Sequence, residues 1–432
     1  MSDLEQVLTK ENVKNEEIDT YINFLTEFAF FFYKKEQSSL SEDEFREFMQ
    51  DYLKKYNLPV KEDVLISKLH KTQIIKLDCL KNYSFCYPYL YYFFVAKYLS
   101  EHIETNNQLI DSILENLHKD QNAYIAIFIS HHSKKAYILD KLSHNAKILF
   151  ERHKVAELTK DEVDCFDSKL DVIVKEALPA TNSTPEKERA ERLEIQDNIE
   201  HISEQEESSF QEEDDELGIE LRRSIKTVEV MGRIIKNRAG SLEKKMLESI
   251  FEEGIKVHLR ILSSFFEAIQ NEEEEFVEYI SDRLKKIVNE KERLRKLRGK
   301  ATSCPSTNEL EKLARSIFWN MNFFVIYGII NKIVHSLGSD KLTNIVKNVC
   351  DNENTPASFL VKHGILMWYN KNLQLDNIIL KIDNDGFSET AKKIIKFMIA
   401  KHCALHNVDY KQKQRIQEKL GIPYQKLIKQ ST

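Results

Sequence analysis

Glycine is so sparse in this chain that two familiar ways of binding a nucleotide are excluded. The 432 residues include 10 glycines, and no two of them are closer than eight positions apart. The dinucleotide-binding motif G-x-G-x-x-G and the P-loop G-x-x-x-x-G-K-[ST] both need glycines two to five positions apart, so neither is present. If the protein works with a nucleotide, we expect another chain to bind it.

The same scarcity predicts a mainly α-helical fold. With 10 glycines and 7 prolines, the chain has few of the residues that form tight turns, while 42% of its residues are apolar and 31% are charged. A length of 432 residues also predicts two or three domains. We therefore expect helical domains with little sheet.

The distribution of cysteine and of apolar residues predicts a cytoplasmic protein. Six cysteines are scattered without a C-x-x-C pair, which is typical of reduced thiols. The N-terminus has no basic segment followed by an apolar core, so no signal peptide is expected. The longest apolar stretches, 86–96 and 317–330, are shorter than the roughly 18 residues that span a bilayer. We expect no membrane contact.

Negative charge is concentrated in one segment. Residues 181–220 carry 15 Asp and Glu against three basic residues, a net charge of -12, whereas the rest of the chain has 60 basic and 55 acidic residues. Such a segment has too few large apolar residues to form a core. We predict a winged-helix-like unit with an aromatic helix at 1–106, a helical bundle at 107–178, an acidic linker at 179–216 and a C-terminal helical domain at 217–432.

The clearest strand pattern of the chain lies in its first 106 residues. Apolar residues recur at helical spacing over 18–32, and Ser41 with Glu44 predicts a capping box that begins a second helix. The segments 74–77 and 83–87 predict two short strands joined by a turn. Helices followed by one β-hairpin are typical of a winged-helix-like unit. An irregular array of α-helices is expected after it.

An aromatic helix is predicted directly after the hairpin. Pro88 suits the first turn of a helix, and the residues that follow it are apolar around most of the circumference. We predict that this helix is packed on nearly every side and docks on the winged-helix-like unit. The residues expected to make these packing or interdomain contacts are Phe85, Tyr89, Tyr91, Tyr92, Phe93, Phe94, Ala96, Tyr98 and Leu99.

Three residues near the C-terminus are the candidate metal ligands. His402 and His406 are one turn apart on a predicted helix, the spacing of paired zinc ligands, and Cys403 lies between them. There is no H-E-x-x-H motif, and a further ligand would have to come from a distant part of the chain. We therefore predict no bound metal, no cofactor and no catalytic residue, and these three positions serve only an alternative metal-dependent enzyme.

A basic helix is the candidate nucleic-acid surface. Residues 283–300 carry nine Lys and Arg against two acidic residues, which could follow a phosphate backbone. Leu284 and Ile287, however, belong to a predicted buried stripe, and basic residues on the other face are typical of any solvated helix. The residues that would contact nucleic acid are Lys285, Lys286, Arg293 and Arg295.

One segment resembles a known class of proteins. Residues 68–103 read KLHKTQIIKLDCLKNYSFCYPYLYYFFVAKYLSEHI, which resembles the junction after the ATPase core in bacterial NACHT-like proteins of the STAND class, the signal-transduction ATPases with numerous domains. In that class a winged-helix unit ends in a hairpin and an aromatic helix, matched here at 85–99. The helical stretch at 125–150 also resembles the continuation found in those proteins.

The resemblance implies a regulatory role without catalysis. The nucleotide-binding motifs of this class lie upstream of the junction, and residues 1–67 contain no P-loop. The implied protein is the C-terminal half of a STAND-type NTPase, a helical regulatory or sensor module that contacts a separate NTPase or effector subunit in bacterial anti-phage defence. The helical domain after the linker is expected to offer the partner surface. Two alternatives stay open, a helical metal-dependent nuclease and a nucleic-acid-binding effector.

Overall fold

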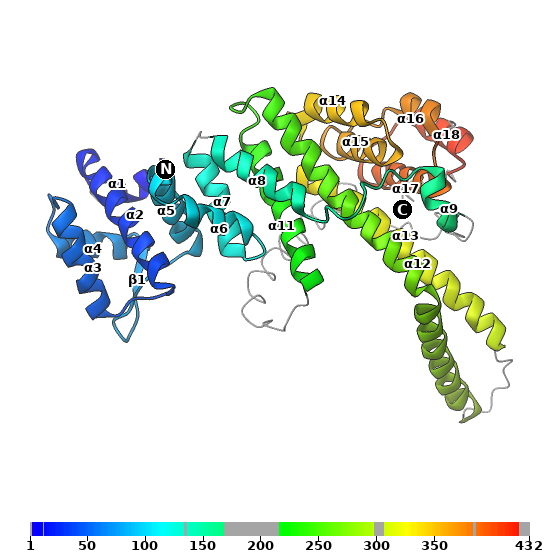
Figure 1. The fold of residues 1–432 in the computed structure, drawn as a ribbon, viewed down its shortest axis with the longest axis horizontal. Helices are drawn as coiled ribbons and strands as arrows, with labels where there is room; N and C mark the ends of the chain where they lie inside the picture. Colours follow the sequence, from blue (N-terminus) through cyan, green and yellow to red (C-terminus); the bar gives the residue numbers. More distant parts are fainter. Residues whose placement is uncertain are drawn as a thin grey trace. The chain divides into compact units, whose positions relative to one another are not determined.

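The computed structural model describes residues 2–11, 13–133, 136–167, 216–297, 306–382 and 386–422, with the side chains of 2–5, 165 and 291–297 left out. The described chain is mainly α-helical with one two-stranded antiparallel sheet, as predicted (Figure 1). It divides into two compact units, residues 1–145 and 146–432. The division falls inside the segment predicted as one bundle, and nearly all of the predicted acidic linker lies outside the described residues.

Unit 1 begins with helices, continues through the hairpin and ends with helices. Its elements are α1 (Ser2–Lys10), η1 (Asn15–Glu17), α2 (Ile18–Lys35), α3 (Glu42–Lys55), α4 (Glu62–Lys71), β1 (Ile75–Leu77), β2 (Tyr83–Phe85), α5 (Pro88–Glu101), η2 (Ile103–Thr105), α6 (Asn107–Glu115) and α7 (Asp120–His132), and α8 (Ala136–Ile148) reaches into unit 2. The hairpin pairs Ile75 with Phe85 and Leu77 with Tyr83. A further antiparallel bridge joins Leu40 to Tyr83.

Local signals place the first helices and the hairpin turn. The predicted capping box is present, because the Ser41 hydroxyl accepts a hydrogen bond from the Glu44 amide and the Glu44 carboxylate accepts one from the Ser41 amide. In the turn, the Asp78 carboxylate accepts hydrogen bonds of 2.8 Å from the amides of Leu80 and Asn82. These bonds satisfy backbone donors that the two short strands leave unpaired.

Phenylalanine rings form the core of unit 1. Phe28 of α2 lies 4.9 Å from Phe48 of α3 and 5.8 Å from Phe85 of β2, measured between ring centroids. Phe85 in turn lies 6.4 Å from Phe94 of α5. The hairpin is therefore held against α2, α3 and α5 by ring contacts, which contribute beyond the apolar area they bury.

Unit 2 consists of longer helices. They are α9 (Lys160–Asp167), α11 (Glu216–Asn237), α12 (Lys244–Leu297), α13 (Thr307–Leu337), η3 (Asp340–Leu342), α14 (Thr343–Glu353), α15 (Pro356–Tyr369), α16 (Leu375–Ile382), α17 (Glu389–Leu405) and α18 (Tyr410–Leu420). The C-terminal part of α12 and the N-terminal part of α13 form a helical hairpin that projects from the other helices of the unit (Figure 1). Arg315 of α13 pairs across this hairpin with Glu273 and Glu274 of α12.

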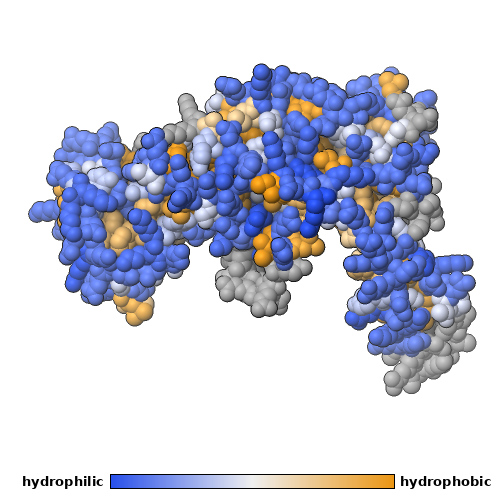
Figure 2. Space-filling model, in the orientation of Figure 1, coloured by the Kyte–Doolittle hydropathy of each residue, from blue (hydrophilic) through white to orange (hydrophobic). Residues whose placement is uncertain are grey.

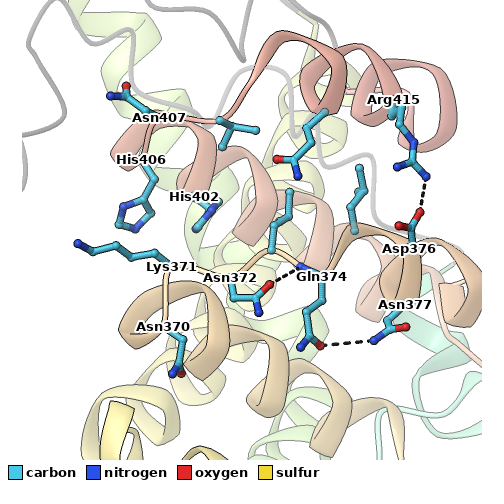
Figure 3. Close-up of a pocket in the computed structure, with 14 residues that line it drawn as sticks. Asn370, Lys371, Asn372, Gln374, Asp376, Asn377, His402, His406, Asn407 and Arg415 are labelled. Atoms are coloured by element: carbon cyan, nitrogen blue, oxygen red, sulfur yellow. Dashed lines mark hydrogen bonds and ion pairs between the residues drawn. The ribbon is translucent and has the colours of Figure 1, made fainter.

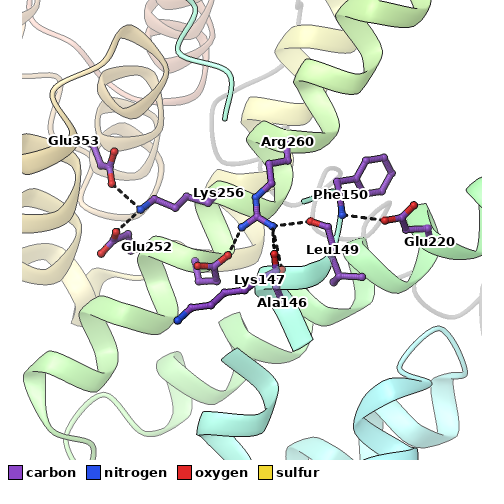
Figure 4. Close-up of polar contacts among 10 residues, drawn as sticks. Ala146, Lys147, Leu149, Phe150, Glu220, Glu252, Lys256, Arg260 and Glu353 are labelled. Atoms are coloured by element: carbon purple, nitrogen blue, oxygen red, sulfur yellow. Dashed lines mark hydrogen bonds and ion pairs between the residues drawn. The ribbon is translucent and has the colours of Figure 1, made fainter. Parts of the chain in front are cut away.

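A buried ion pair within α12 positions Arg260 to hydrogen-bond the residues at the end of α8. The Arg260 guanidinium contacts the Glu253 carboxylate, and the two side chains are 8% and 10% exposed. The other amino group of Arg260 donates to the carbonyl oxygens of Lys147 at 2.9 Å and Leu149 at 2.6 Å (Figure 4). Lys147 lies in the last turn of α8, and Leu149 follows the helix. Arg260 therefore satisfies carbonyl groups that every helix leaves unpaired at its C-terminus.

The residues after α8 are hydrogen-bonded to several helices of unit 2. The Ala357 amide at the start of α15 donates to the Glu157 carbonyl at 2.9 Å. Asp167 caps α17, because its carboxylate accepts hydrogen bonds of 2.7 Å from the amide and hydroxyl of Thr390. The segment 146–167 therefore belongs to unit 2 and not to the helices that precede it.

The helix α13 is apolar over much of its length. Within the described residues it is the helix long and apolar enough to cross a membrane, and 44% of its most apolar window is buried inside the protein. Burial of this kind is common in a core helix of a globular domain. The face of the molecule drawn in Figure 2 is mainly hydrophilic, with separate hydrophobic groups.

Candidate functional site

A pocket of about 950 Å³ opens where four helices of unit 2 begin or end. It lies at the C-terminal ends of α15 and α17 and at the N-terminal ends of α16 and α18 (Figure 3). The lining residues are Asn370, Lys371, Asn372, Leu373, Gln374, Leu375, Asp376, Asn377, His402, His406, Asn407, Val408, Gln412 and Arg415. The volume lies in the range of small-molecule sites, and the walls are mainly polar.

The loop between α15 and α16 has an unusual backbone at the pocket. Lys371 and Gln374 have φ angles of 53° and 45°, in the left-handed region that favours glycine. The loop is held by the Asn370 side chain, which donates to the Thr343 hydroxyl at 2.9 Å, and by the Asn372 amide, which donates to the Leu366 carbonyl at 3.0 Å. Left-handed residues of this type cluster at ligand sites, so the loop is a functional candidate.

His402 enters the pocket from α17 as a neutral imidazole. Its residue surface is 6% exposed, and Nδ1 lies 3.2 Å from the Met367 carbonyl oxygen. Burial, followed by the charge of His406, lowers the pKa of His402 to about 4. Because the Met367 oxygen can only accept, Nδ1 is assigned the proton and Nε2 carries the lone pair. The ring of His406 lies 4.5 Å away between centroids.

In the described part of the chain, the candidate ligands His402, Cys403 and His406 do not form a metal site. His402 and His406 lie together, but Cys403 is buried and its pKa is raised to about 12 by that burial, so its thiol stays protonated. Among the described residues, no group of three His, Cys, Asp or Glu side chains is placed to hold a metal ion. Structural and catalytic zinc sites use at least three protein ligands.

The basic helix lies in the projecting hairpin. The Lys285 ammonium is 3.0 Å from the Asp282 carboxylate, and Lys286 is exposed. The side chains of Arg293 and Arg295 lie outside the described ones. Ile287 was predicted to be buried, but it is 49% exposed because this part of α12 extends beyond the other helices of unit 2. The prediction of a buried stripe was therefore wrong at this position.

The aromatic helix α5 lies against α2 and α7 of unit 1. Phe94, Ala96 and Leu99 are fully buried and Phe85 is 9% exposed. Tyr89 is 43% exposed, so this end of the helix is open on one side. The remaining residues of the predicted set, Tyr91, Tyr92, Phe93 and Tyr98, are half-buried.

Ring contacts account for those intermediate positions. Tyr98 stacks on Phe30 of α2 with 3.7 Å between centroids, and Phe93 lies 5.7 Å from Phe128 of α7. The C-terminal part of α5 is therefore packed on nearly every side, as predicted, whereas its N-terminal part is more exposed.

The pocket residues outside α17 were not found from the sequence. The only signal for them was the turn-forming run Asn370-Lys371-Asn372, which breaks the helical pattern. Arg415 and Gln412 lie on an ordinary polar helix, and nothing in their spacing marks them. A pocket assembled from two interhelical loops depends on tertiary contacts that no local pattern encodes.

Comparison with known families concerns unit 1. Residues 38–95 match the family model described as Novel STAND NTPase 4. The match runs from just before α3 through the hairpin and into α5, and it relates this stretch to the STAND NTPases. It overlaps the segment at 68–103 that resembles the STAND class. No curated protein and no solved structure matches the chain.

Buried histidines predict a loss of stability in mild acid. Burial is the main cause that lowers the pKa of His258, His335 and His402 to about 4 and that of His363 to about 3. In the unfolded chain they titrate near 6.5, so below that pH the unfolded state binds more protons than the folded one. We expect the free energy of unfolding to fall between about pH 6.5 and pH 5, by up to about 1.4 kcal/mol per pH unit for each histidine.

Chemical denaturation of the full chain at several pH values checks this expectation. His363→Leu is the informative variant, since His363 is 0% exposed and neither ring nitrogen has a hydrogen-bond partner in the described structure. Without His363, the slope of the free energy of unfolding against pH should decrease by the amount that corresponds to about one bound proton. A free energy of unfolding that stays constant over this window would contradict the assigned neutral state.

Proposed function

We propose that this chain is a non-catalytic regulatory or sensor module of a STAND-type system. In this proposal it is the C-terminal part of such a protein, acts in the cytoplasm without membrane contact, and works with a separate NTPase or effector subunit in bacterial anti-phage defence. The observation that carries the proposal is the family match at 38–95. The absence of a P-loop from the sequence is consistent with a partner that supplies nucleotide chemistry.

The order of elements in unit 1 supports a winged-helix-like assignment for the matched stretch. Helix α2 is followed by the bridge at Leu40, then by α3, α4, β1 and β2. The Leu40 amide donates to the Tyr83 carbonyl at 2.9 Å, and the Tyr83 amide donates back at 2.8 Å. Leu40 thereby takes the place of a short third strand beside β2. We propose that the β1–β2 turn is the wing.

An exposed apolar face of α13 is the proposed partner surface. Residues 316–331 contain no charged residue, so the helix is apolar on sides that the rest of unit 2 does not cover. Three apolar residues within this segment remain 40% to 59% exposed, namely Met321, Phe324 and Val325, and we call them the α13 face. An exposed apolar strip with no charge along it is typical of a protein interface.

A charge placed on the α13 face should release the partner. Met321 is 59% exposed, so Met321→Glu adds a carboxylate without disturbing the core, and it would be desolvated in any apolar interface. We expect Met321→Glu to lose the NTPase or effector subunit in affinity purification from the native host. Leu380→Glu is the matched control, because Leu380 is 73% exposed on α16 of the same unit.

Two outcomes would count against the α13 face as a protein interface. Equal recovery of the subunit with Met321→Glu and with the unaltered chain would place the interface elsewhere. Sedimentation of the unaltered chain with lipid vesicles, abolished by Met321→Glu, would instead make this face a membrane surface. The control variant should behave like the unaltered chain in both assays.

A further inference from the structure

We propose that the polar pocket at the ends of α15 and α17 binds a small phosphorylated molecule that also carries hydrogen-bonding groups. This inference deepens the sensor role and rests on it only for its biological meaning, since the pocket is formed within unit 2 alone. The pocket volume of about 950 Å³ is large enough for a phosphorylated metabolite.

Within the described residues, an unpaired lysine lies at one end of the pocket, and an ion pair with no net charge lies at the other. In the described structure the Lys371 ammonium makes no ion pair, and Lys371 lines the same pocket as His406 (Figure 3). At the opposite end Arg415 is paired with Asp376 (Figure 3). A lysine that lines a cavity without a carboxylate partner is suited to an anion, and phosphate is the common biological anion that lysine binds as a point charge.

Two helix starts lie on one side of the pocket. The helices α16 (Leu375–Ile382) and α18 (Tyr410–Leu420) both begin at the pocket. The first amide groups of a helix carry partial positive charge and favour anions nearby. Asp409 caps α18 by accepting a hydrogen bond of 2.8 Å from the Gln412 amide, and Asp376 lies in the first turn of α16. Both helix starts therefore already have a carboxylate nearby, and the anion preference of the pocket rests on Lys371.

Carboxamide side chains supply the hydrogen-bonding part of the site. Within the described residues, the side chains of Asn407 and Gln412 make no hydrogen bond. The Asn372 oxygen accepts a hydrogen bond of 3.2 Å from the Gln374 amide, which leaves the Asn372 amino group able to donate. Amide groups both donate and accept, so they suit hydroxyl or amide groups of a ligand.

The same charges argue against a cation. A divalent metal held between His402 and His406 would share the pocket with the Lys371 ammonium, which repels it. The described residues offer no third His, Cys, Asp or Glu ligand to offset that repulsion. The pair of imidazoles therefore lines an anion pocket in this proposal and does not form a metal site.

Calorimetric titration of the full chain tests the proposal with three probes: inorganic pyrophosphate, ribose 5-phosphate and ribose. We expect both phosphorylated probes to bind with dissociation constants of about 1 mM or tighter and ribose not to bind. Binding should weaken as salt is raised, because the attraction is electrostatic.

Lys371→Asn is the variant that addresses the site. Asparagine tolerates the left-handed φ of 53° at this position, so the loop should keep its shape while the charge is lost. We expect binding of the phosphorylated probes to weaken about tenfold or more. Lys81→Asn is the matched control, because Lys81 has a φ of 63° in the exposed hairpin turn of unit 1. It should bind like the unaltered chain.

Three results would overturn the inference. The first is that neither phosphorylated probe gives a heat of binding at about 10 mM. The second is that ribose and ribose 5-phosphate bind equally well. The third is that Lys371→Asn binds the phosphorylated probes with unchanged affinity. Binding of Zn²⁺ that is abolished by His402→Ala, without binding of pyrophosphate, would make the site a metal site instead. None of these results depends on a protein partner, so failure here is distinguishable from failure of the proposed regulatory function.

Discussion

Arg260→Ala is expected to destabilise unit 2 by about 3–5 kcal/mol. The substitution removes one member of a buried ion pair and leaves the Glu253 carboxylate, 10% exposed, without its partner. It also removes the donor that satisfies the carbonyl oxygens of Lys147 and Leu149. An uncompensated buried charge and unsatisfied carbonyls together account for the size of the effect.

Chemical denaturation of the full chain measures this loss. Arg283→Ala is the matched control, since Arg283 lies on the same helix but is exposed and contacts the Tyr279 hydroxyl at 3.2 Å. We expect the control to lie within about 0.5 kcal/mol of the unaltered protein. Replacement of both partners, with Arg260→Met and Glu253→Leu, should recover much of the stability, because it leaves no buried charge unpaired. A change below about 1 kcal/mol for Arg260→Ala would contradict the described ion pair.

Gly232→Ala should be nearly as damaging for a different reason. A Cβ atom at Gly232 of α11 would lie 1.9 Å from the backbone oxygen of Ser336 in α13. No side-chain rotation relieves a clash with backbone, so α11 and α13 must move apart. The contacts between these helices would then loosen, at a cost of about 3 kcal/mol or more.

Thermal unfolding of Gly232→Ala and Gly240→Ala separates this clash from the general effect of alanine. At Gly240 an added Cβ meets nothing within 4 Å and the φ angle is not positive. Alanine at Gly240 should be neutral or slightly stabilising, because it reduces the freedom of the unfolded chain. Equal unfolding temperatures for the two variants would mean that α11 and α13 do not approach as closely as described.

The elements that were predicted well are those with local signals. Ser41 and Glu44 are three positions apart, and this spacing alone specifies the capping box that begins α3. Pro88 stands in the first turn of α5, where its missing amide donor costs nothing. The hairpin follows from a change of apolar period between 74 and 87. In each case neighbouring residues contain the information.

The features that the sequence did not reveal depend on contacts between distant residues. Ile287 has the spacing of a buried residue, yet it is exposed because α12 extends beyond the body of unit 2. The pocket joins Lys371, His402 and Arg415 from three segments of chain. The division between residues 145 and 146 likewise follows from hydrogen bonds such as Ala357 to Glu157, 200 positions apart. Periodicity within one helix does not specify these pairings.

We propose that this chain regulates a separate STAND-type partner. Affinity purification of the tagged full chain from its native host, followed by mass spectrometry and measurement of the native mass, tests it most directly. We expect a complex with a distinct NTPase or effector subunit, which Leu380→Glu retains and Met321→Glu loses. Recovery of the chain as a lone monomer, with no associated NTPase or effector, would contradict it.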